Sequence, residues 1–180
     1  NYNNVSVYNG DCNNVLLKSV FPRCQYKEYR RALCLLDPYG LPLNWEVIET
    51  AGKMKSIEIF LNFPVADINR NVLWNDPKGV DEGDLNRMNA FWGDESWRDV
   101  AYETEGNLFG LEEKTDNITF ARAFQERLKK VAGFSFVPDP IPMRNSKSAI
   151  VYYLFFASHK PASDKIVKDI LKKYRNKGKK

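Results

Sequence analysis

The chain has 180 residues, 43% of them hydrophobic and 13% aromatic, and it carries a formal net charge of +4. This length suits one domain, and the apolar content excludes disorder over most of the chain. The longest apolar runs, 32–36 and 150–157, are much shorter than the roughly 20 residues that a membrane-spanning helix needs. We therefore predict a single domain, 1–180, with no membrane segment.

The cysteines, Cys12, Cys24 and Cys34, are odd in number and form no CxxC pair. Together with the presence of only one histidine, this argues against both a disulfide framework and a zinc site. The chain also opens without a charged and then apolar leader. These features predict reduced thiols, a cytoplasmic location and no metal site.

Charge is distributed unevenly along the chain. Residues 160–180 contain nine Lys or Arg and two acids, a local charge of +7, whereas residues 76–116 contain twelve acids and four basic residues. A basic tail can bind the phosphate backbone of a nucleic acid, but it is also a common solubilising terminus. Both interpretations of the tail stay open.

The first half of the chain alternates between strand and helix patterns. Residues 4–8 alternate in polarity as a strand does, and a turn signal follows them. Next come a short helix at 12–20 and an apolar strand at 32–38 that ends in proline. A helix from about Asn44 leads to a strand at 56–64. This spacing predicts βαβ units and a parallel sheet.

The second half begins with a different segment, 65–115, in which acidic and aromatic residues are interleaved. We predict that it is a partly helical lobe inserted into the domain. A helix at 117–132 follows, with its apolar residues on one stripe. Two neighbouring strands, 134–143 and 148–158, and a helix capped by Ser163 complete the chain. The predicted fold is α/β, a mostly parallel sheet with helices on both faces.

Polar residues follow three predicted strands at their carboxyl ends, where ligands bind in an open parallel sheet. They are Gly10 and Asp11 after the first strand, Asp37, Pro38, Tyr39 and Gly40 after the second, and Asn62 at the end of the third. We expect these ends to share one crevice. Ionised carboxylates only accept hydrogen bonds, so Asp11 and Asp37 would each accept from an amine or hydroxyl of a ligand. The ring of Tyr39 could stack on a planar base.

Other interpretations of these residues stay open. Gly-Asp and Asp-Pro pairs also occur at strand ends simply because they form turns. Catalysis by a Ser-His-Asp or Cys-His arrangement would have to use His159, and no nucleophile motif precedes it. A metal-dependent nuclease or phosphotransferase that uses the clustered acids is a further alternative, although these acids lack ligand spacing.

Four blocks of the sequence resemble one known family. They are VYNGDCNNVL, LCLLDPYGLPLNWEVIE, IEIFLNFPVADINRNVL and NSKSAIVYYLFFASHKPASDKIVKDIL. Spread over the whole chain, these blocks resemble the three-Cys-motif partner protein (TcmP) family. That name refers to a motif in a neighbouring protein, so the cysteines of this chain are not the motif. The family is similar to class I, S-adenosylmethionine-dependent methyltransferases, which have a Rossmann-like sheet.

The resemblance implies roles for the strand-end residues. Gly10 and Asp11 would contact the adenine of S-adenosylmethionine. The target amine of a nucleic acid would be bound by a motif of three residues: Asp37, Pro38 and Tyr39. The order Asp-Pro-Tyr-Gly lacks the second proline that is usual in such motifs. Gly40 and Asn62 would lie beside the substrate.

The resemblance also implies a segment that this chain lacks. Class I methyltransferases begin with a strand that leads into a glycine-rich loop, which holds the methionine half of the cofactor. A second strand then ends in an acid that binds the ribose. This chain opens at what would be the third strand. The first two strands are therefore expected on a preceding segment or on another chain.

Two functions follow as predictions. The first is a methyltransferase-like domain that acts on or binds nucleic acid, with the lobe at 65–115 selecting the substrate and the basic tail binding phosphate. The alternative is a non-catalytic, methyltransferase-like partner that docks another protein through the acidic aromatic lobe.

Overall fold

The structure, a computed structural model, describes residues 4–74, 76–103 and 113–177. The α-helices are α1 (Cys12–Val15), α2 (Trp45–Met54), α3 (Val65–Asn71), α4 (Glu82–Trp92), α5 (Trp97–Ala101), α6 (Asn117–Lys130) and α7 (Pro161–Lys177). A π-helix, Leu16–Val20, extends α1, and 3₁₀ turns lie at Phe21–Arg23, Tyr26–Glu28 and Pro77–Gly79. The strands are β1 (Ala32–Leu36), β2 (Ile57–Phe63), β3 (Tyr102–Glu103), β4 (Glu113–Lys114), β5 (Ile141–Arg144) and β6 (Ile150–Ala157).

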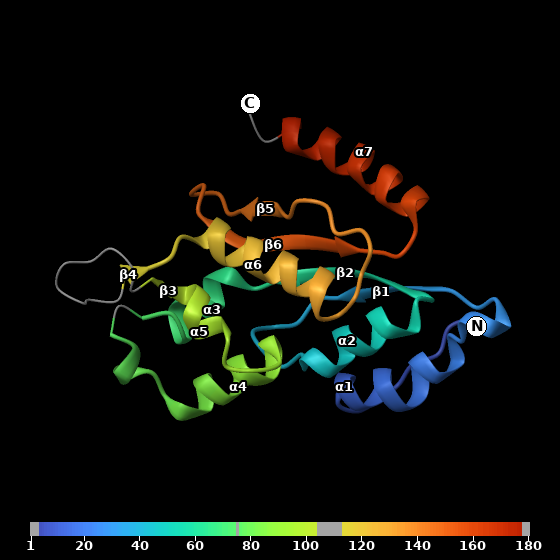
Figure 1. Ribbon diagram of the computed structural model, residues 1–180, viewed down its shortest axis with the longest axis horizontal. Helices are drawn as coiled ribbons and strands as arrows, with labels where there is room; N and C mark the ends of the chain where they lie inside the picture. The colour runs from blue at the N-terminus through green and yellow to red at the C-terminus, as the bar shows by residue number, and fades with distance from the viewer. Residues whose placement is uncertain (1–3, 75, 104–112, 178–180) are drawn as a thin grey trace.

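Four strands form one mixed sheet in the order β1-β2-β6-β5 (Figure 1). The βαβ unit made by β1, α2 and β2 is parallel as predicted, but β6 runs antiparallel to both β2 and β5. The prediction of a mostly parallel sheet is therefore wrong. β5 and β6 are joined by a tight turn in which Asn145 N donates to Ala149 O at 3.0 Å. So short a connection cannot cross over the sheet, and it forces the two strands to run in opposite directions.

The predicted strand at 4–8 is also wrong. The segment pairs with no strand in the described part of the chain, and Val5 and Val7 are 63% and 90% exposed. An alternating pattern becomes a strand only where a neighbour completes its backbone hydrogen bonds. β1 pairs with β2 alone among the described residues, so its other side is a sheet edge.

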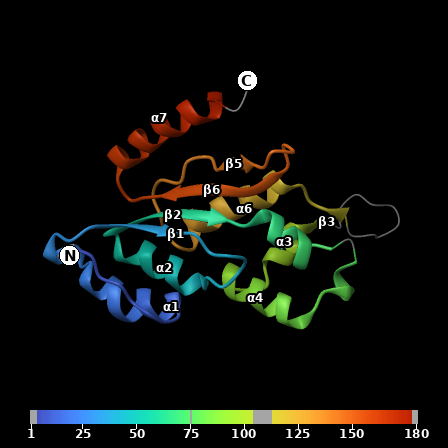
Figure 2. The ribbon, with the colours of Figure 1, turned by 180° about the vertical axis from the view of Figure 1, so that it is seen from behind.

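Helices cover the two faces of the sheet unequally. On one face, alternate residues of β2 from Ile57 to Phe63 are buried beneath α2 and α6. Phe63 lies at the centre of this core, with its ring centroid 4.7 Å from that of Phe124. On the opposite face α7 packs alone, through Val167 and Leu171. Figures 1 and 2 show α7 on one side of the sheet and α1 and α2 on the other.

The acidic segment packs into the same core as the rest of the domain. It contains α3, α4, α5 and the β3–β4 pair, while residues 104–112 of the predicted lobe lie outside the described residues. Phe91, Trp92 and Trp97 are buried in the main hydrophobic cluster. Among the described acidic side chains, six are exposed: Asp76, Asp81, Glu82, Asp94, Glu95 and Asp99. Phe91, Trp92 and Trp97 anchor the segment to the domain.

The last helix starts earlier than predicted. α7 begins at Pro161, a residue type well suited to a first helical position. Ser163 does not cap it, because its hydroxyl donates instead to Glu58 Oε1 on β2, at 2.7 Å. No helix in the described ranges combines the length and the apolar character needed to cross a membrane.

Candidate functional site

Asp37 and Asn62 meet at the carboxyl ends of the two parallel strands. Asp37 directly follows β1, and Asn62 is the next-to-last residue of β2. The register pairs Leu36 with Leu61, so Asn62 Nδ2 donates a hydrogen bond of 2.6 Å to Asp37 Oδ1. The amide thereby orients a carboxylate that is exposed to solvent. These two strand ends lie together as the sequence predicted.

One surface pocket of about 330 Å³ is lined by five of the predicted residues: Asp37, Pro38, Tyr39, Gly40 and Asn62. The side chain of Tyr39 is fully exposed and can contact a ligand. Gly40 has a φ of +78°, and a Cβ there would lie 3.1 Å from Asp67 Oδ2 of α3. Only glycine meets both conditions without strain. The turn is therefore shaped by its close approach to α3.

A second pocket, of about 410 Å³, lies between β1 and the segment that leads into α1. Gly10 lines it together with Asp37 and Pro38, so the first and second predicted strand ends share a cavity. Most of its other walls are apolar or thiol side chains: Cys12, Val15, Leu16, Cys34, Leu35, Leu36 and Leu43. Such a pocket can take a planar, largely apolar group with a polar edge directed at Asp37.

Asp11 serves the fold of the chain. Its Oδ1 atom accepts hydrogen bonds from Asn14 N at 2.9 Å and from Asn14 Nδ2 at 3.1 Å. This is the N-cap interaction that stabilises the start of a helix. The residues that line the Gly10 pocket do not include Asp11. The structure therefore favours the turn and cap interpretation for Asp11, which the sequence had left open.

Asn13 is a buried polar residue that sequence reasoning missed. It is 6% exposed. Its Nδ2 atom donates to Pro42 O at 2.8 Å, and its Oδ1 atom accepts from Asn44 N at 2.8 Å. These bonds fasten the start of α1 to the loop between Gly40 and α2, and so hold the two sides of the Gly10 pocket together. The only signal in the sequence was an asparagine inside a predicted helix, where it is disfavoured.

Cys34 borders the same pocket as a neutral thiol. Burial raises its pKa to about 11, with smaller contributions from Cys24 and Cys12. A protonated thiol is a poor nucleophile and a poor metal ligand. Within the described ranges, no group of three or more His, Cys, Asp or Glu side chains is arranged to hold a metal ion.

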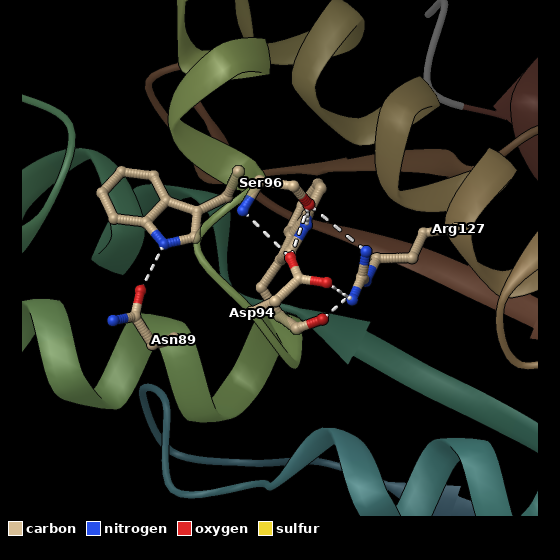
Figure 3. Close-up of polar contacts among 6 residues, drawn as sticks. Asn89, Asp94, Ser96 and Arg127 are labelled. Carbon is tan, nitrogen blue, oxygen red and sulfur yellow. Dashed lines mark hydrogen bonds and ion pairs between the residues drawn. The ribbon is translucent and has the colours of Figure 1, made fainter.

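Arg127 of α6 is the centre of a polar network that was not predicted (Figure 3). Its Nε atom donates to Trp92 O and its Nη2 atom to Asp94 Oδ2, both at 2.6 Å. The guanidinium also lies over the Trp45 ring, 4.7 Å from its centroid. Partial burial opposes ionisation of Asp94, but hydrogen bonds from Ser96 and Arg127 hold the pKa of its carboxyl below the usual range.

The network has a structural role. Trp92 Nε1 donates to Ser96 Oγ at 3.0 Å, and Trp97 Nε1 donates to Asn89 Oδ1 at 2.7 Å (Figure 3). The side chain of Arg127 is only 11% exposed, and its donors are directed at partners within the fold. These contacts fasten α4 and α5 to α6 and hold the acidic segment against the domain.

His159 lies at the other end of the sheet from Asp37. It follows β6, which runs antiparallel to β2, so it sits near the amino ends of β1 and β2. Its Nε2 atom donates to Gly52 O at 2.7 Å, and its ring stacks on Phe134 with 5.2 Å between centroids. Burial lowers the pKa of the imidazole. The structure does not bring His159 to the strand-end pockets.

Comparison with protein-family models, curated proteins and solved structures finds no match to this chain. The functional argument therefore rests on the strand-end geometry. A carboxylate oriented by an amide, an exposed aromatic ring beside it and a mostly apolar pocket lie together. Such a site can accept a hydrogen bond from an amine or hydroxyl and stack a planar group.

Proposed function

We propose that the chain is the C-terminal part of a Rossmann-like, S-adenosylmethionine-dependent methyltransferase-like domain that acts on or binds nucleic acid. The observation that carries this proposal is the 2.6 Å bond between Asn62 and Asp37, beside a pocket that Gly10 also lines. The strand order supports it as well. β1 and β2 form a parallel pair within an α/β fold, and ligands bind at the carboxyl ends of such strands.

The Gly10 pocket fits one half of the cofactor. Its volume of about 410 Å³ and its apolar walls suit an adenine ring. Asp11 does not fit the role that the resemblance implies, because it caps α1. Asp37 is the carboxylate that lines the pocket and can accept from the adenine amino group or from a substrate. When bound, S-adenosylmethionine supplies an electrophilic methyl group.

The residues of the chain position the acceptor. Asp37 accepts a hydrogen bond from the acceptor amine and thereby fixes the direction of the nitrogen lone pair. Asn62 holds the carboxylate in this orientation. The exposed ring of Tyr39 provides a surface on which the target base can stack.

The free edge of β1 is the place where this domain would be completed. Leu33 and Leu35 on β1 are 54% and 71% exposed, and apolar side chains on a sheet edge are normally covered. Both side chains stand out from one face of the sheet, so an element packed on that face would cover them. A further parallel strand, from a preceding segment or from another chain, would pair with the open backbone edge of β1. It would also bring a glycine-rich loop to the carboxyl end of β1, beside the Gly10 pocket.

Isothermal titration calorimetry with S-adenosylmethionine tests the proposal. It compares the 180-residue chain with a chain that includes the residues encoded before Asn1. We expect the longer chain to bind, and Asp37→Asn to lower methyl transfer to an oligonucleotide by about 100-fold or more while binding persists. Asp99→Asn, which removes an exposed carboxylate of α5, is the matched control. Absence of binding by the longer chain would overturn the enzyme proposal.

One observation favours the second candidate, a non-catalytic partner protein. The exposed edge of β1 offers a docking surface, whereas Phe91, Trp92 and Trp97 of the acidic segment are buried and Trp74 is 43% exposed. Under this proposal, Leu33→Lys with Leu35→Lys abolishes co-purification with the partner and leaves the fold intact. Unchanged co-purification by this double variant would count against docking at β1.

A further inference from the structure

A pocket of about 590 Å³ lies between α6, α7 and the segment before β5, and it shares no lining residue with the two strand-end pockets. We call it the α6–α7 pocket. Lys129 of α6 lines it together with Lys168 and Lys172 of α7. Asp139 is the acidic residue of its lining. Two helices from opposite faces of the sheet thus place three ammonium groups and one carboxylate around one cavity.

The lysines of this pocket can turn toward an anionic ligand. Lys129 pairs with Glu126 at 2.8 Å and Lys168 with Asp164 at 2.6 Å, each one turn away on its own helix. The Lys129–Glu126 pair contributes at most about 1 kcal/mol, because water competes for both partners. In the second pair the Lys168 side chain is exposed, whereas that of Asp164 is only 13% exposed. The side chain of Lys172 forms no hydrogen bond or ion pair with the residues that the structure describes. A phosphate could therefore recruit Lys129 and Lys172 at low cost, and it could accept from Lys168 through the N–H groups that Asp164 does not use.

Gln125 gives the pocket a fixed polar wall. It is 6% exposed, and its Nε2 atom donates to Val137 O at 2.8 Å. This bond engages the Nε2 end of the amide, and the Oε1 atom stays available as an acceptor. Lysines beside an amide oxygen favour a ligand that carries both an anionic group and a hydrogen-bond donor. A nucleotide unit of a nucleic-acid strand has both, in its phosphate and in its base or sugar.

The surroundings of the pocket favour a polymeric ligand. α7 belongs to the segment 160–180, whose local charge is +7. Lysines bind phosphates with little dependence on base sequence, and each contact adds to the salt dependence of binding. Free phosphate would use the pocket alone, whereas a strand would also use the lysines along α7.

We propose that the α6–α7 pocket binds consecutive phosphates of a nucleic-acid strand. Lys129, Lys168 and Lys172 contact the phosphates, and Gln125 accepts from a neighbouring base or sugar. This inference rests on the nucleic-acid part of the proposed function and not on methyl transfer. It adds a binding site away from the strand ends where a base would be modified.

Fluorescence anisotropy with a labelled single-stranded DNA of 12 nucleotides, measured over a range of KCl concentrations, tests the pocket. The test variant is Lys129→Gln with Lys168→Gln and Lys172→Gln. Glutamine is chosen because its amide can still donate to Asp164, whose side chain is 13% exposed. We expect affinity to fall at least about tenfold, and the slope of log K against log salt to become shallower by about 2, because each phosphate contact of a single strand contributes roughly 0.7.

The matched control replaces three exposed lysines elsewhere and changes the net charge equally: Lys18→Gln, Lys27→Gln and Lys147→Gln. We expect the control to keep most of the affinity. Equal losses in both triple variants would overturn the pocket and leave only a net-charge effect. If the triple variant fails to fold, Lys172→Glu takes its place, because Lys172 is exposed and a single substitution there preserves the fold. We expect Lys172→Glu to weaken binding, and normal binding by this variant would overturn the pocket.

The same experiment separates this proposal from the proposed function. Because anisotropy needs no cofactor, a failed titration with S-adenosylmethionine leaves it unaffected. No binding of the oligonucleotide by the unaltered chain would overturn both the pocket and the nucleic-acid part of the proposed function. If the pocket variants bound the oligonucleotide as tightly as the unaltered chain does, only the proposal for the α6–α7 pocket would be overturned.

Discussion

At the scale of single residues, Asp11 and Asp37 acquire different roles from similar sequence signals. Asp11 bonds to Asn14, three positions away, so its cap forms wherever the helix forms. Asp37 bonds to Asn62, 25 positions away, and this pair exists only when β1 and β2 pair in the observed register. A carboxylate positioned by tertiary structure at a pocket is therefore the stronger candidate for ligand binding.

Asp94 makes the stability of the fold depend on pH. The pKa of its carboxyl is lowered in the folded state from 3.8, so its contribution is present above that value and is lost as the pH falls through the folded pKa. Asp94→Asn should lower the free energy of unfolding at pH 7 by about 1 kcal/mol. The difference should shrink near pH 3, as urea unfolding at both pH values would show. Asp99→Asn is the control. If Asp94→Asn lowered the free energy of unfolding equally at both pH values, this account would be contradicted.

Both the backbone conformation at position 93 and the close approach of Trp45 require glycine there. Its φ is +101°, and an added Cβ would lie 2.5 Å from Trp45 Cδ1. Gly93→Ala should therefore destabilise the protein by about 3 kcal/mol. Gly133→Ala is the control, because Gly133 has a φ of +84° but no atom within 4 Å of an added Cβ. It should cost only about 1 kcal/mol in thermal or urea unfolding. Equal losses would show that the Trp45 contact relaxes.

At the scale of elements, β1 and β2 differ in what covers them. β2 has a strand on each side, whereas β1 has an edge without a partner among the described residues. Leu33 and Leu35 lie on the same face of β1 and are exposed. Natural edge strands commonly carry lysine or proline, which block pairing with another chain. β1 has neither, so it is open to further strand pairing.

This edge should cause association at high protein concentration. Leu33→Lys with Leu35→Lys should lower the average mass in sedimentation velocity and change the free energy of unfolding by less than about 1 kcal/mol, because both side chains are exposed. Val5→Lys with Val7→Lys removes exposed apolar groups outside any strand and is the control. Equal behaviour of the two double variants would argue against association through β1.

At the scale of the whole molecule, the two faces of the sheet carry cores of different size. The main cluster joins α2, α4, α6 and both central strands, with Phe124 among its buried residues. Among the described side chains, the cluster beneath α7 has four buried members: Ile141, Phe156, Val167 and Leu171. Because free energy of burial scales with the apolar area removed from water, α7 should open before the rest of the domain does.

Hydrogen exchange measured by mass spectrometry tests this order of opening. Leu171→Ala should cost about 2 kcal/mol, and the loss should appear as faster exchange in α7 while β2 stays protected. Phe124→Ala, in the main core, should accelerate exchange in both elements, because it lowers the global stability by about 3–5 kcal/mol. If Leu171→Ala accelerated exchange in β2 as much as in α7, the two clusters would be one cooperative unit.

Hydrophobic periodicity located most of the elements. β1 and β2 fall within the predicted strands at 32–38 and 56–64, and α6 falls within the helix predicted at 117–132. The strand predicted at 4–8 failed because its pattern says nothing about whether a pairing partner exists. The polar network of Arg127 was missed because its partners Trp92 and Asp94 are 35 and 33 positions away in the sequence.

The sequence by itself determined elements whose local patterns are strong, such as β1, β2 and α6, and the turn residues that follow β1, because these depend on neighbours a few positions apart. Only the tertiary structure decided that residues 4–8 form no strand, the order and direction of the strands, and the pairing of Asp37 with Asn62. It also buried Phe91, Trp92 and Trp97 of the acidic segment in the main core. These outcomes depend on contacts between distant parts of the chain, which no local pattern encodes.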